Sequence, residues 1–210
     1  MTVNHARVER AELCDLFESL GPHAMTLCDG WSAADLAAHL VVRERRPDAA
    51  LGILAGPLAR HGENVRRSYA ARPWGELVGL VRDGPPLLSV FALPGVERLA
   101  NTMEFFIHHE DLRRPNGLEP RVMDSDMEDQ LWTIVDRMSK MFLRKAPAGV
   151  TLRATDGRST VARKADPMVT VSGDVGELAL FIYGRQHAAQ VMLDGPENAV
   201  SAVREANFGI

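Results

Sequence analysis

The segment from Met103 to Asp111 places a carboxylate and an imidazole inside an otherwise apolar helical pattern, which limits the folds that the chain can adopt. Glu104 and His108 are four residues apart, so in a helix their Cβ atoms lie about 5 to 6 Å apart on one face. They can hold one ion between them, but two ligands do not complete a site. The best third donor is His39, which lies in another predicted helix among apolar neighbours. The sequence therefore predicts a metal ion bound by His39, Glu104 and His108 in the core of a helical bundle.

The composition sets outer limits on the class of protein. With 210 residues, 46% of them hydrophobic, the chain can bury a sizeable core in one large domain or in a main domain with a small appendage. A net charge of -4 gives no electrostatic reason to bind nucleic acid. The first ten residues lack the apolar core of a signal peptide, and no later run is suited to crossing a membrane. We expect a cytoplasmic protein without a membrane partner. Two cysteines are too few for a disulfide scaffold or a cysteine-built zinc site.

Hydrophobic periodicity predicts four main helices in the first part of the chain. Ser32 with Asp35 three residues later is typical of a capping box at the start of the second helix. Glycine and proline pairs interrupt the region between residues 47 and 95, where we expect two short helices and a loop that ends at Pro94. The main helices are expected at residues 4–20, 32–45, 96–114 and 125–145, and the short ones at 58–71 and 74–82.

The pattern changes after Ala146-Pro147-Ala148-Gly149, where apolar residues begin to alternate with polar ones. The Asp156-Gly157 pair between two such runs predicts a β-hairpin with a type I′ turn. The remaining elements are expected to be strands at 150–154, 159–164, 169–171 and 189–193, and helices at 177–183 and 197–206. The predicted fold is mainly α with a small α+β C-terminal domain, divided into residues 1–147 and 148–210.

Two histidines and a carboxylate are a common ligand set for a catalytic zinc ion that keeps a fourth position open. The same set also binds ferrous iron, so another divalent ion remains an alternative. An ion with an open position lowers the pKa of water or of a thiol and so supplies a nucleophile at neutral pH. Asp111 and Asp35 are placed one turn from the two histidines and are candidates to orient the imidazoles by hydrogen bonds.

Each of these residues also has a structural interpretation. Glu104 and His108 can form a metal-free hydrogen-bonded pair, and His39 can be a core histidine. Cys28 precedes a capped helix, which suits either a reactive nucleophile or a structural thiol, whereas Cys14 is expected in the core. Arg185 follows Gly184 and either binds an anion or only ends a helix.

Two longer strings resemble a known family. Cys28 to Leu40 reads C-D-G-W-S-A-A-D-L-A-A-H-L and resembles the opening of DinB-like metal-binding bundles, specifically the actinobacterial mycothiol-dependent maleylpyruvate isomerase group. Glu104 to Leu112 reads E-F-F-I-H-H-E-D-L and is similar to the second motif of that group. Gly173 to Arg185 resembles its small C-terminal domain. The resemblance implies a DinB-like four-helix bundle followed by a short β-hairpin-containing domain.

The resemblance also implies an activity. In that family a zinc ion, here at the matching His39, Glu104 and His108, activates the low-molecular-weight thiol mycothiol for transfer to, or isomerisation of, a small electrophilic substrate. A basic residue of the C-terminal domain assists, and Arg185 is the nearest candidate for this catalytic and thiol-binding role, with Asp111 as the second catalytic candidate. No convincing pair of cations for the two carboxylates of maleylpyruvate is evident, so the substrate is not carried over. A metal-dependent hydrolase and a non-enzymatic metal-binding or structural module are the alternatives, and monomer and homodimer both remain open.

Overall fold

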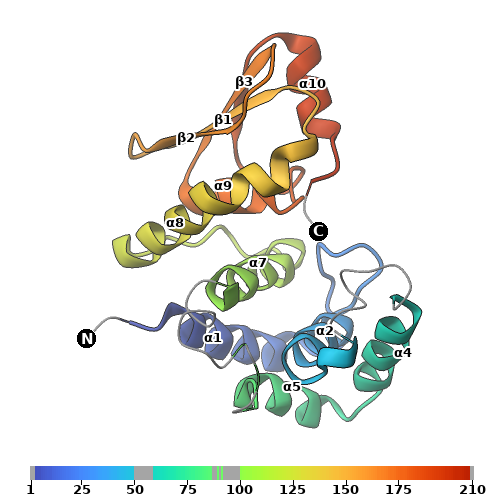
Figure 1. Cartoon of the computed structure of the whole chain (residues 1–210). Helices are drawn as coiled ribbons and strands as arrows, with labels where there is room; N and C mark the ends of the chain where they lie inside the picture. The colour runs from blue at the N-terminus through green and yellow to red at the C-terminus, as the bar shows by residue number, and fades with distance from the viewer. Residues whose placement is uncertain (1–2, 50–58, 87–88, 90, 92–99, 209–210) are drawn as a thin grey trace. The chain divides into compact units, whose positions relative to one another are not determined.

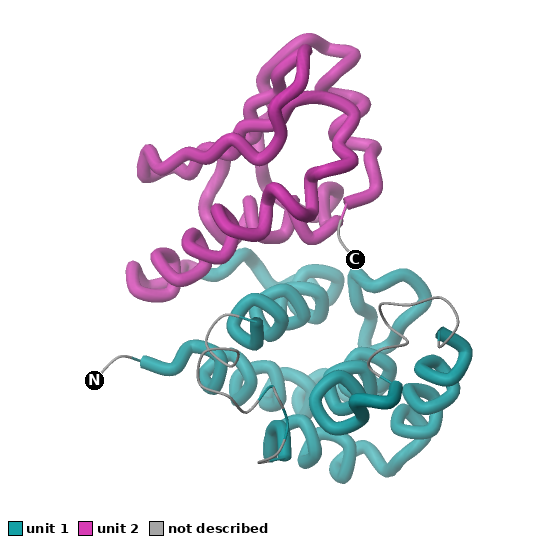
Figure 2. The backbone as a smooth tube through the Cα atoms, viewed as in Figure 1, with its two compact units in different colours: residues 1–121 teal, residues 122–210 magenta. Residues whose placement is uncertain are grey.

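The computed structural model describes residues 3–49, 59–86, 89, 91 and 100–208 (Figure 1). The chain forms two compact units, Met1–Arg121 and Val122–Ile210 (Figure 2). The described part of the first unit is helical, and the second combines helices with a four-stranded sheet. The predicted fold class, mainly α with a small α+β C-terminal part, is confirmed.

The first unit contains the expected helices at nearly the expected positions. Ser32 caps the second of them as predicted, since its hydroxyl accepts from the Asp35 amide and its own amide donates to the Asp35 carboxylate. The expected loop before Pro94 and the expected helix start at residue 96 lie outside the described residues. The described elements are α1 (His5–Leu20), α2 (Ala33–Arg45), α4 (Ala59–Ala70), α5 (Trp74–Asp83), α7 (Thr102–Arg113) and the 3-10 helix η4 (Arg114–Asn116).

A single apolar core joins α1, α2, α5 and α7. Phe17, Leu36, Leu77 and Phe105, one from each helix, belong to it and are fully buried. Burying one such side chain contributes about 1.5 to 3 kcal/mol. In α7 the eight consecutive residues from Phe105 to Leu112 are all buried. This segment is therefore enclosed around its whole circumference, so its four polar residues, from His108 to Asp111, need partners inside the protein.

The second unit contains a mixed sheet. The strand order is β2-β1-β3-β4, with β1 parallel to β3 and the two outer pairs antiparallel. The helix expected at 125–145 groups with this unit, whereas the sequence-based division at residue 147 counts it with the bundle. Its apolar stripe ends at Phe142, whose ring packs 4.5 Å from that of Tyr183. The elements are α8 (Ser125–Phe142), η5 (Leu143–Lys145), β1 (Gly149–Ala154), β2 (Ser159–Arg163), β3 (Met168–Gly173), α9 (Val175–Ile182), β4 (Met192–Asp194) and α10 (Glu197–Glu205).

The hairpin between β1 and β2 is present, but the predicted type I′ turn is wrong. That turn needs positive φ at both central residues, and only Gly157, at φ 93°, has it, because Asp156 keeps a negative φ. Ala154 and Arg158 close the loop by a backbone hydrogen bond of 2.8 Å, so three residues lie between them. In this three-residue loop only the last residue, Gly157, needs the left-handed conformation, so Asp156 does not have to adopt it. The last strand also begins at Met192 rather than at residue 189.

Gly149, the first residue of β1, offers a stability prediction for the second unit. A Cβ atom at this position would overlap the backbone carbonyl of Ala165 and the sulfur of Met168. Because a backbone atom cannot move aside easily, Gly149→Ala is expected to destabilise the unit by about 1 to 3 kcal/mol. Thermal and urea unfolding measure the effect. Gly79→Ala in α5 is the matched control, since nothing lies within 4 Å of its added Cβ, and a gain of roughly 0.5 to 1 kcal/mol is expected there.

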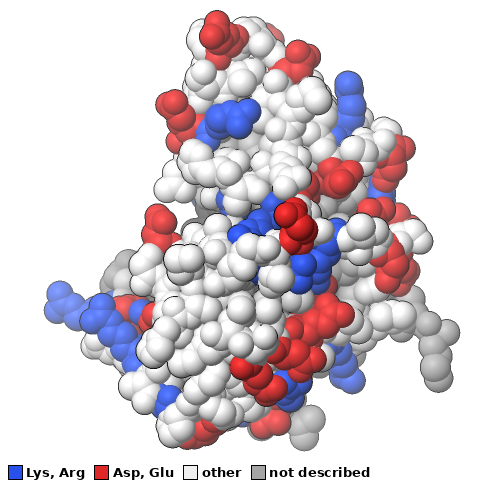
Figure 3. Space-filling model, turned by 180° about the vertical axis from the view of Figure 1, so that it is seen from behind, with Lys and Arg blue, Asp and Glu red and all other residues white. Residues whose placement is uncertain are grey.

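The charges on the surface agree with the similar numbers of acidic and basic residues in the sequence. On the face shown in Figure 3, side chains of both charges are interspersed. No helix among the described residues is long and apolar enough to span a bilayer.

Candidate metal centre

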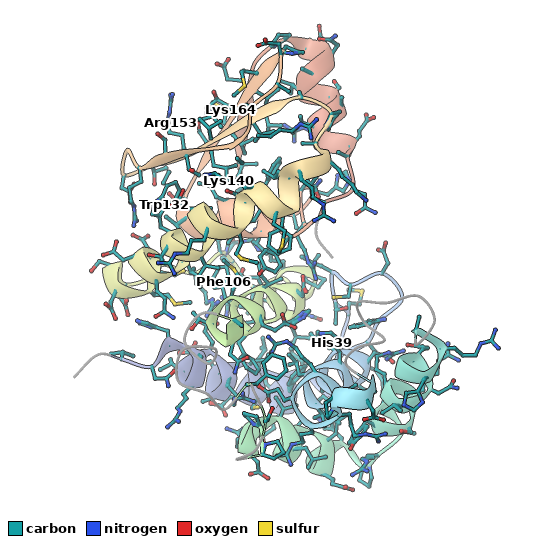
Figure 4. The ribbon with its side chains drawn as sticks, in the orientation of Figure 1. His39, Phe106, Trp132, Lys140, Arg153 and Lys164 are labelled. Carbon is teal, nitrogen blue, oxygen red and sulfur yellow. The ribbon has the colours of Figure 1, made fainter. Side chains whose placement is uncertain are left out.

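His39, Glu104 and His108 converge as the sequence predicts. Oε1 of Glu104 lies 3.1 Å from Nε2 of His39 and 3.3 Å from Nε2 of His108. His39 comes from α2 and the other two residues from α7, and Figure 4 shows His39 between these two helices. The three side chains are 10 to 19% exposed. The centre is therefore nearly enclosed, with its largest opening at the carboxylate.

The donor atoms have the spacing that a small divalent ion requires. A tetrahedral zinc ion with bonds of about 2.0 to 2.1 Å holds its ligand atoms roughly 3.3 Å apart. The two nitrogen-to-oxygen distances from Glu104 match this value, and all three donor atoms lie within 4.8 Å of one another. The residues present therefore fit a divalent ion by type and by distance. The same two distances also suit direct hydrogen bonds. Without an ion, Glu104 and the two histidines therefore serve as hydrogen-bond partners for one another.

The charges of the three ligands are set by their surroundings. Burial disfavours ionisation of Glu104, but the Arg43 guanidinium and the hydrogen bonds from both histidines outweigh it and hold the pKa of Glu104 well below its usual value. Burial also lowers the pKa of His39, and the hydrogen bond to Glu104 offsets this only in part. At neutral pH the carboxylate is thus ionised and His39 is neutral, which are the forms that bind a metal ion.

His108 differs from His39 because it faces polar groups on both sides. Burial opposes its protonation, but hydrogen bonds with Asp111, Cys28 and Glu104 outweigh burial and raise the pKa of His108 well above its usual value. Without an ion, His108 therefore carries a proton that a metal would have to displace.

Asp111 contacts His108 from the side opposite Glu104. Its Oδ2 atom lies 2.9 Å from Nδ1 of His108, so the imidazole directs Nε2 towards Glu104. The Asp111 side chain is fully buried. A partner that the sequence did not indicate is Cys28, whose thiol donates to the same oxygen at 3.2 Å. Cys28 thus belongs to the surroundings of the centre, whereas Cys14 is buried in the core, where desolvation raises its pKa to about 12.

Hydrogen bonds join the turn before α2 to α7 and to η4, which explains how Cys28 reaches Asp111. The amide of Leu27 donates to the Asp111 carbonyl at 2.9 Å, and the side-chain amide of Asn116 donates to the Met25 carbonyl at the same distance. At the end of this turn, the Trp31 ring lies 5.2 Å from the His39 ring.

The expected role of Asp35 is not found. Its carboxylate accepts from Ser32 and pairs with Arg66, and no described hydrogen bond joins it to His39. Asp35 is held by the cap of its own helix, so it stabilises the start of α2 rather than orienting the imidazole. Arg66 in turn stacks over Trp31 at 4.9 Å.

Arg43 also contacts the centre, although the sequence did not indicate a role for it. Its Nε lies 3.3 Å from Oε1 of Glu104, the oxygen that faces both histidines. It follows His39 by four residues on α2, and this spacing was the available signal.

Arg185 lies in the second unit, after the end of α9. Its Nη1 donates to the carbonyl of Tyr183 at 2.7 Å, which fits the helix-ending interpretation, and its role towards a ligand stays a prediction. His109, next to the centre in sequence, faces another way and pairs with Glu9 at 3.1 Å. Glu9 also pairs with Arg121, so this second cluster of acidic and histidine side chains is already neutralised by an internal cation.

The fold and the cluster together define a class of protein: a helical domain with a two-histidine, one-carboxylate centre, joined to a small α+β domain. Searches against family profiles and curated proteins found no match. Two solved structures share the fold. One is the mycothiol-dependent maleylpyruvate isomerase, with a TM-score of 0.61 and 15% identity, and the other is a histidine-to-alanine mutant of it, with 0.63 and 14%. Each alignment covers 90% of both chains. The chain thus has the fold of the mycothiol-dependent maleylpyruvate isomerase, as its two motifs indicated.

Proposed function

We propose that this protein is a zinc-dependent enzyme that activates a low-molecular-weight thiol, such as mycothiol, for transfer to, or isomerisation of, a small electrophile. The observation that carries the proposal is the convergence of His39, Glu104 and His108 at the spacing of zinc ligands, with a second carboxylate behind His108. The shared fold supports the thiol because the isomerase of that fold is named as mycothiol-dependent. Nucleic acid and membranes are not among the proposed partners.

Each residue of the centre would have a separate task. His39, Glu104 and His108 would hold the ion, and Asp111 would keep His108 in the orientation that presents Nε2. When bound, zinc would supply a positive charge that lowers the pKa of a thiol and so makes it nucleophilic at neutral pH. Arg185 is our candidate for binding an anionic part of the thiol or substrate. The limited exposure of the centre would exclude bulk water and thereby strengthen these electrostatic interactions.

The test combines metal analysis with a thiol assay. Zinc-loaded protein, mycothiol and a panel of small electrophiles are incubated, and consumption of thiol and of electrophile is followed. For an isomerisation, product is expected to form without net loss of thiol, although the reaction still requires it. Arg185→Gln is expected to raise the KM for the thiol while the zinc content stays at that of the unmodified protein.

Other outcomes would contradict the proposal in distinct ways. Turnover that proceeds equally without thiol would assign the centre to a metal-dependent hydrolase. Absence of bound zinc, together with a melting temperature that a chelator leaves unchanged, would assign it to a metal-free structural pair, since a ligand that binds only the folded state must raise apparent stability.

A further inference from the structure

Arg43 brings a permanent positive charge to the proposed metal centre. Its side chain is only 12% exposed, and its Nε lies 3.3 Å from Oε1 of Glu104. The positive charge of an arginine repels a metal cation, so Arg43 cannot be there to help the centre bind its ion. Arg43 keeps Glu104 ionised, but both histidines also hydrogen-bond this carboxylate, so the cost of a cation beside a metal ligand calls for a further explanation.

The guanidinium of Arg43 is fixed in place by two further contacts. Its Nη1 donates to Oδ1 of Asn101 at 2.8 Å, and its central carbon lies 4.1 Å above the ring of Phe91. Asn101 is itself fully buried, and its amide donates to the Phe91 carbonyl at 3.2 Å. Among the described residues, Nη2 of Arg43 has no hydrogen-bond partner. The positive charge is therefore held in a fixed position beside Glu104.

The balance of charge at the centre shows what that ligand would be. A divalent ion contributes two positive charges, Arg43 contributes one, and Glu104 and Asp111 each contribute one negative charge, while His39 and His108 are neutral when they bind a metal. One positive charge remains uncompensated in a nearly enclosed space. Without Arg43 the same set would be neutral. A univalent anion at the open position restores neutrality, whereas water does not.

We propose that Arg43 is a specificity-determining residue that selects an anionic ligand, such as a thiolate, for the position beside the metal, while weakening the binding of the metal itself. The inference rests on the proposed function, because it requires a divalent ion at His39, Glu104 and His108. It adds a reason why an anionic ligand, such as a thiolate, is preferred there to a neutral water molecule. Arg43 acts by its charge and needs no contact with the reacting atoms.

The experiment measures two affinities whose changes should have opposite signs. Cobalt(II) is bound in place of zinc, and its visible spectrum reports both metal binding and the later binding of thiocyanate as a univalent anion. In Arg43→Gln the affinity for cobalt is expected to rise and the affinity for thiocyanate to fall, each by roughly 10- to 100-fold, as removal of a unit charge beside a nearly enclosed ion implies. Arg43→Lys should restore thiocyanate binding to within a few-fold of the unmodified protein.

Arg46→Gln is the matched control. It removes the same charge at the end of α2, where Arg46 pairs with Asp48, and neither affinity should change. If Arg43→Gln does not fold, the unmodified protein supplies the test: thiocyanate should bind the cobalt form far more tightly than the neutral ligand imidazole.

Three results would overturn the inference. The first is that Arg43→Gln binds thiocyanate as tightly as the unmodified protein does. The second is that its affinities for cobalt and for thiocyanate change in the same direction. The third is that the unmodified cobalt protein binds imidazole as tightly as thiocyanate. If the unmodified protein binds no cobalt or zinc at all, the proposed function fails and this inference fails with it. If it binds metal and only the thiocyanate result is negative, the proposed function stands alone.

Discussion

Replacing Glu104 by glutamine is expected to lower the affinity for zinc by at least about a hundredfold. The loss of an outer partner of a ligand already costs 10- to 100-fold in metal affinity, and here a ligand and the negative charge that both histidines face are removed. Glutamine preserves the size of the side chain, so the apolar packing of α7 stays in place. Competition with a chromophoric chelator measures the change, and circular dichroism checks that the helices are retained.

The control for this prediction lies on the same helix. Glu110 is also a buried glutamate of α7, but it pairs with Arg114 and Arg121 and not with the two histidines. Glu110→Gln should leave zinc affinity unchanged, although it can lower stability. Equal zinc affinity in Glu104→Gln and the unmodified protein would show that the carboxylate is not a ligand, and that Glu104 only neutralises its neighbours.

Glu44→Ala is expected to destabilise the helical unit by about 3 to 5 kcal/mol. Arg10 and Glu44 form a bidentate ion pair of 2.5 and 2.8 Å, with 9% and 2% of their side chains exposed. Removal of one partner leaves a buried charge without compensation, which is what makes this change so costly. The loss is a large fraction of the 5 to 15 kcal/mol that stabilises a typical domain. Urea unfolding, with hydrogen exchange of the amides in α1 and α2, measures the effect.

The double variant Arg10→Met/Glu44→Leu separates the pair from its packing. Because an apolar pair of similar size avoids desolvating two charges, it should recover most of the lost stability. The Val81 carbonyl, which accepts from Arg10 at 2.8 Å, keeps the backbone amide of Gly84 as a donor. Arg82→Ala removes an arginine that pairs with exposed Asp15 and Glu18, and should cost less than about 1 kcal/mol. Similar losses in Glu44→Ala and Arg82→Ala would refute the argument from burial.

The spacing of residues in the sequence was enough to predict the parts of the centre that lie on one helix. Glu104, His108 and Asp111 are related by helical periodicity, so their side chains were expected on one face before any tertiary structure was known. His39 was predicted from its apolar neighbours and from a motif. Helix boundaries followed from capping residues and from glycine and proline, whose effects are local.

The features that escaped prediction depend on contacts between distant segments. Cys28 and Asp111 are 83 residues apart. The thiol meets the carboxylate because hydrogen bonds hold the turn before α2 against α7. Arg43 shares a face with His39, but periodicity does not reveal that Asn101 and Phe91 hold its guanidinium against Glu104. Likewise, the apolar stripe of α8 predicts that one face of the helix is buried but not which elements cover it. The sequence-based division therefore placed α8 with the bundle and the strands in a separate domain.

The enclosure of α7 restricts how proteins of this architecture can change over generations. Insertion of one residue within Phe105 to Leu112 would turn the following part of the helix by about 100°, and every side chain beyond it would meet an unsuitable neighbour. No surface of this segment is left to absorb such a shift, since all eight residues are buried. New substrates are therefore expected to be acquired through substitutions in the segments that surround α7, while the register between Glu104 and His108 is inherited intact.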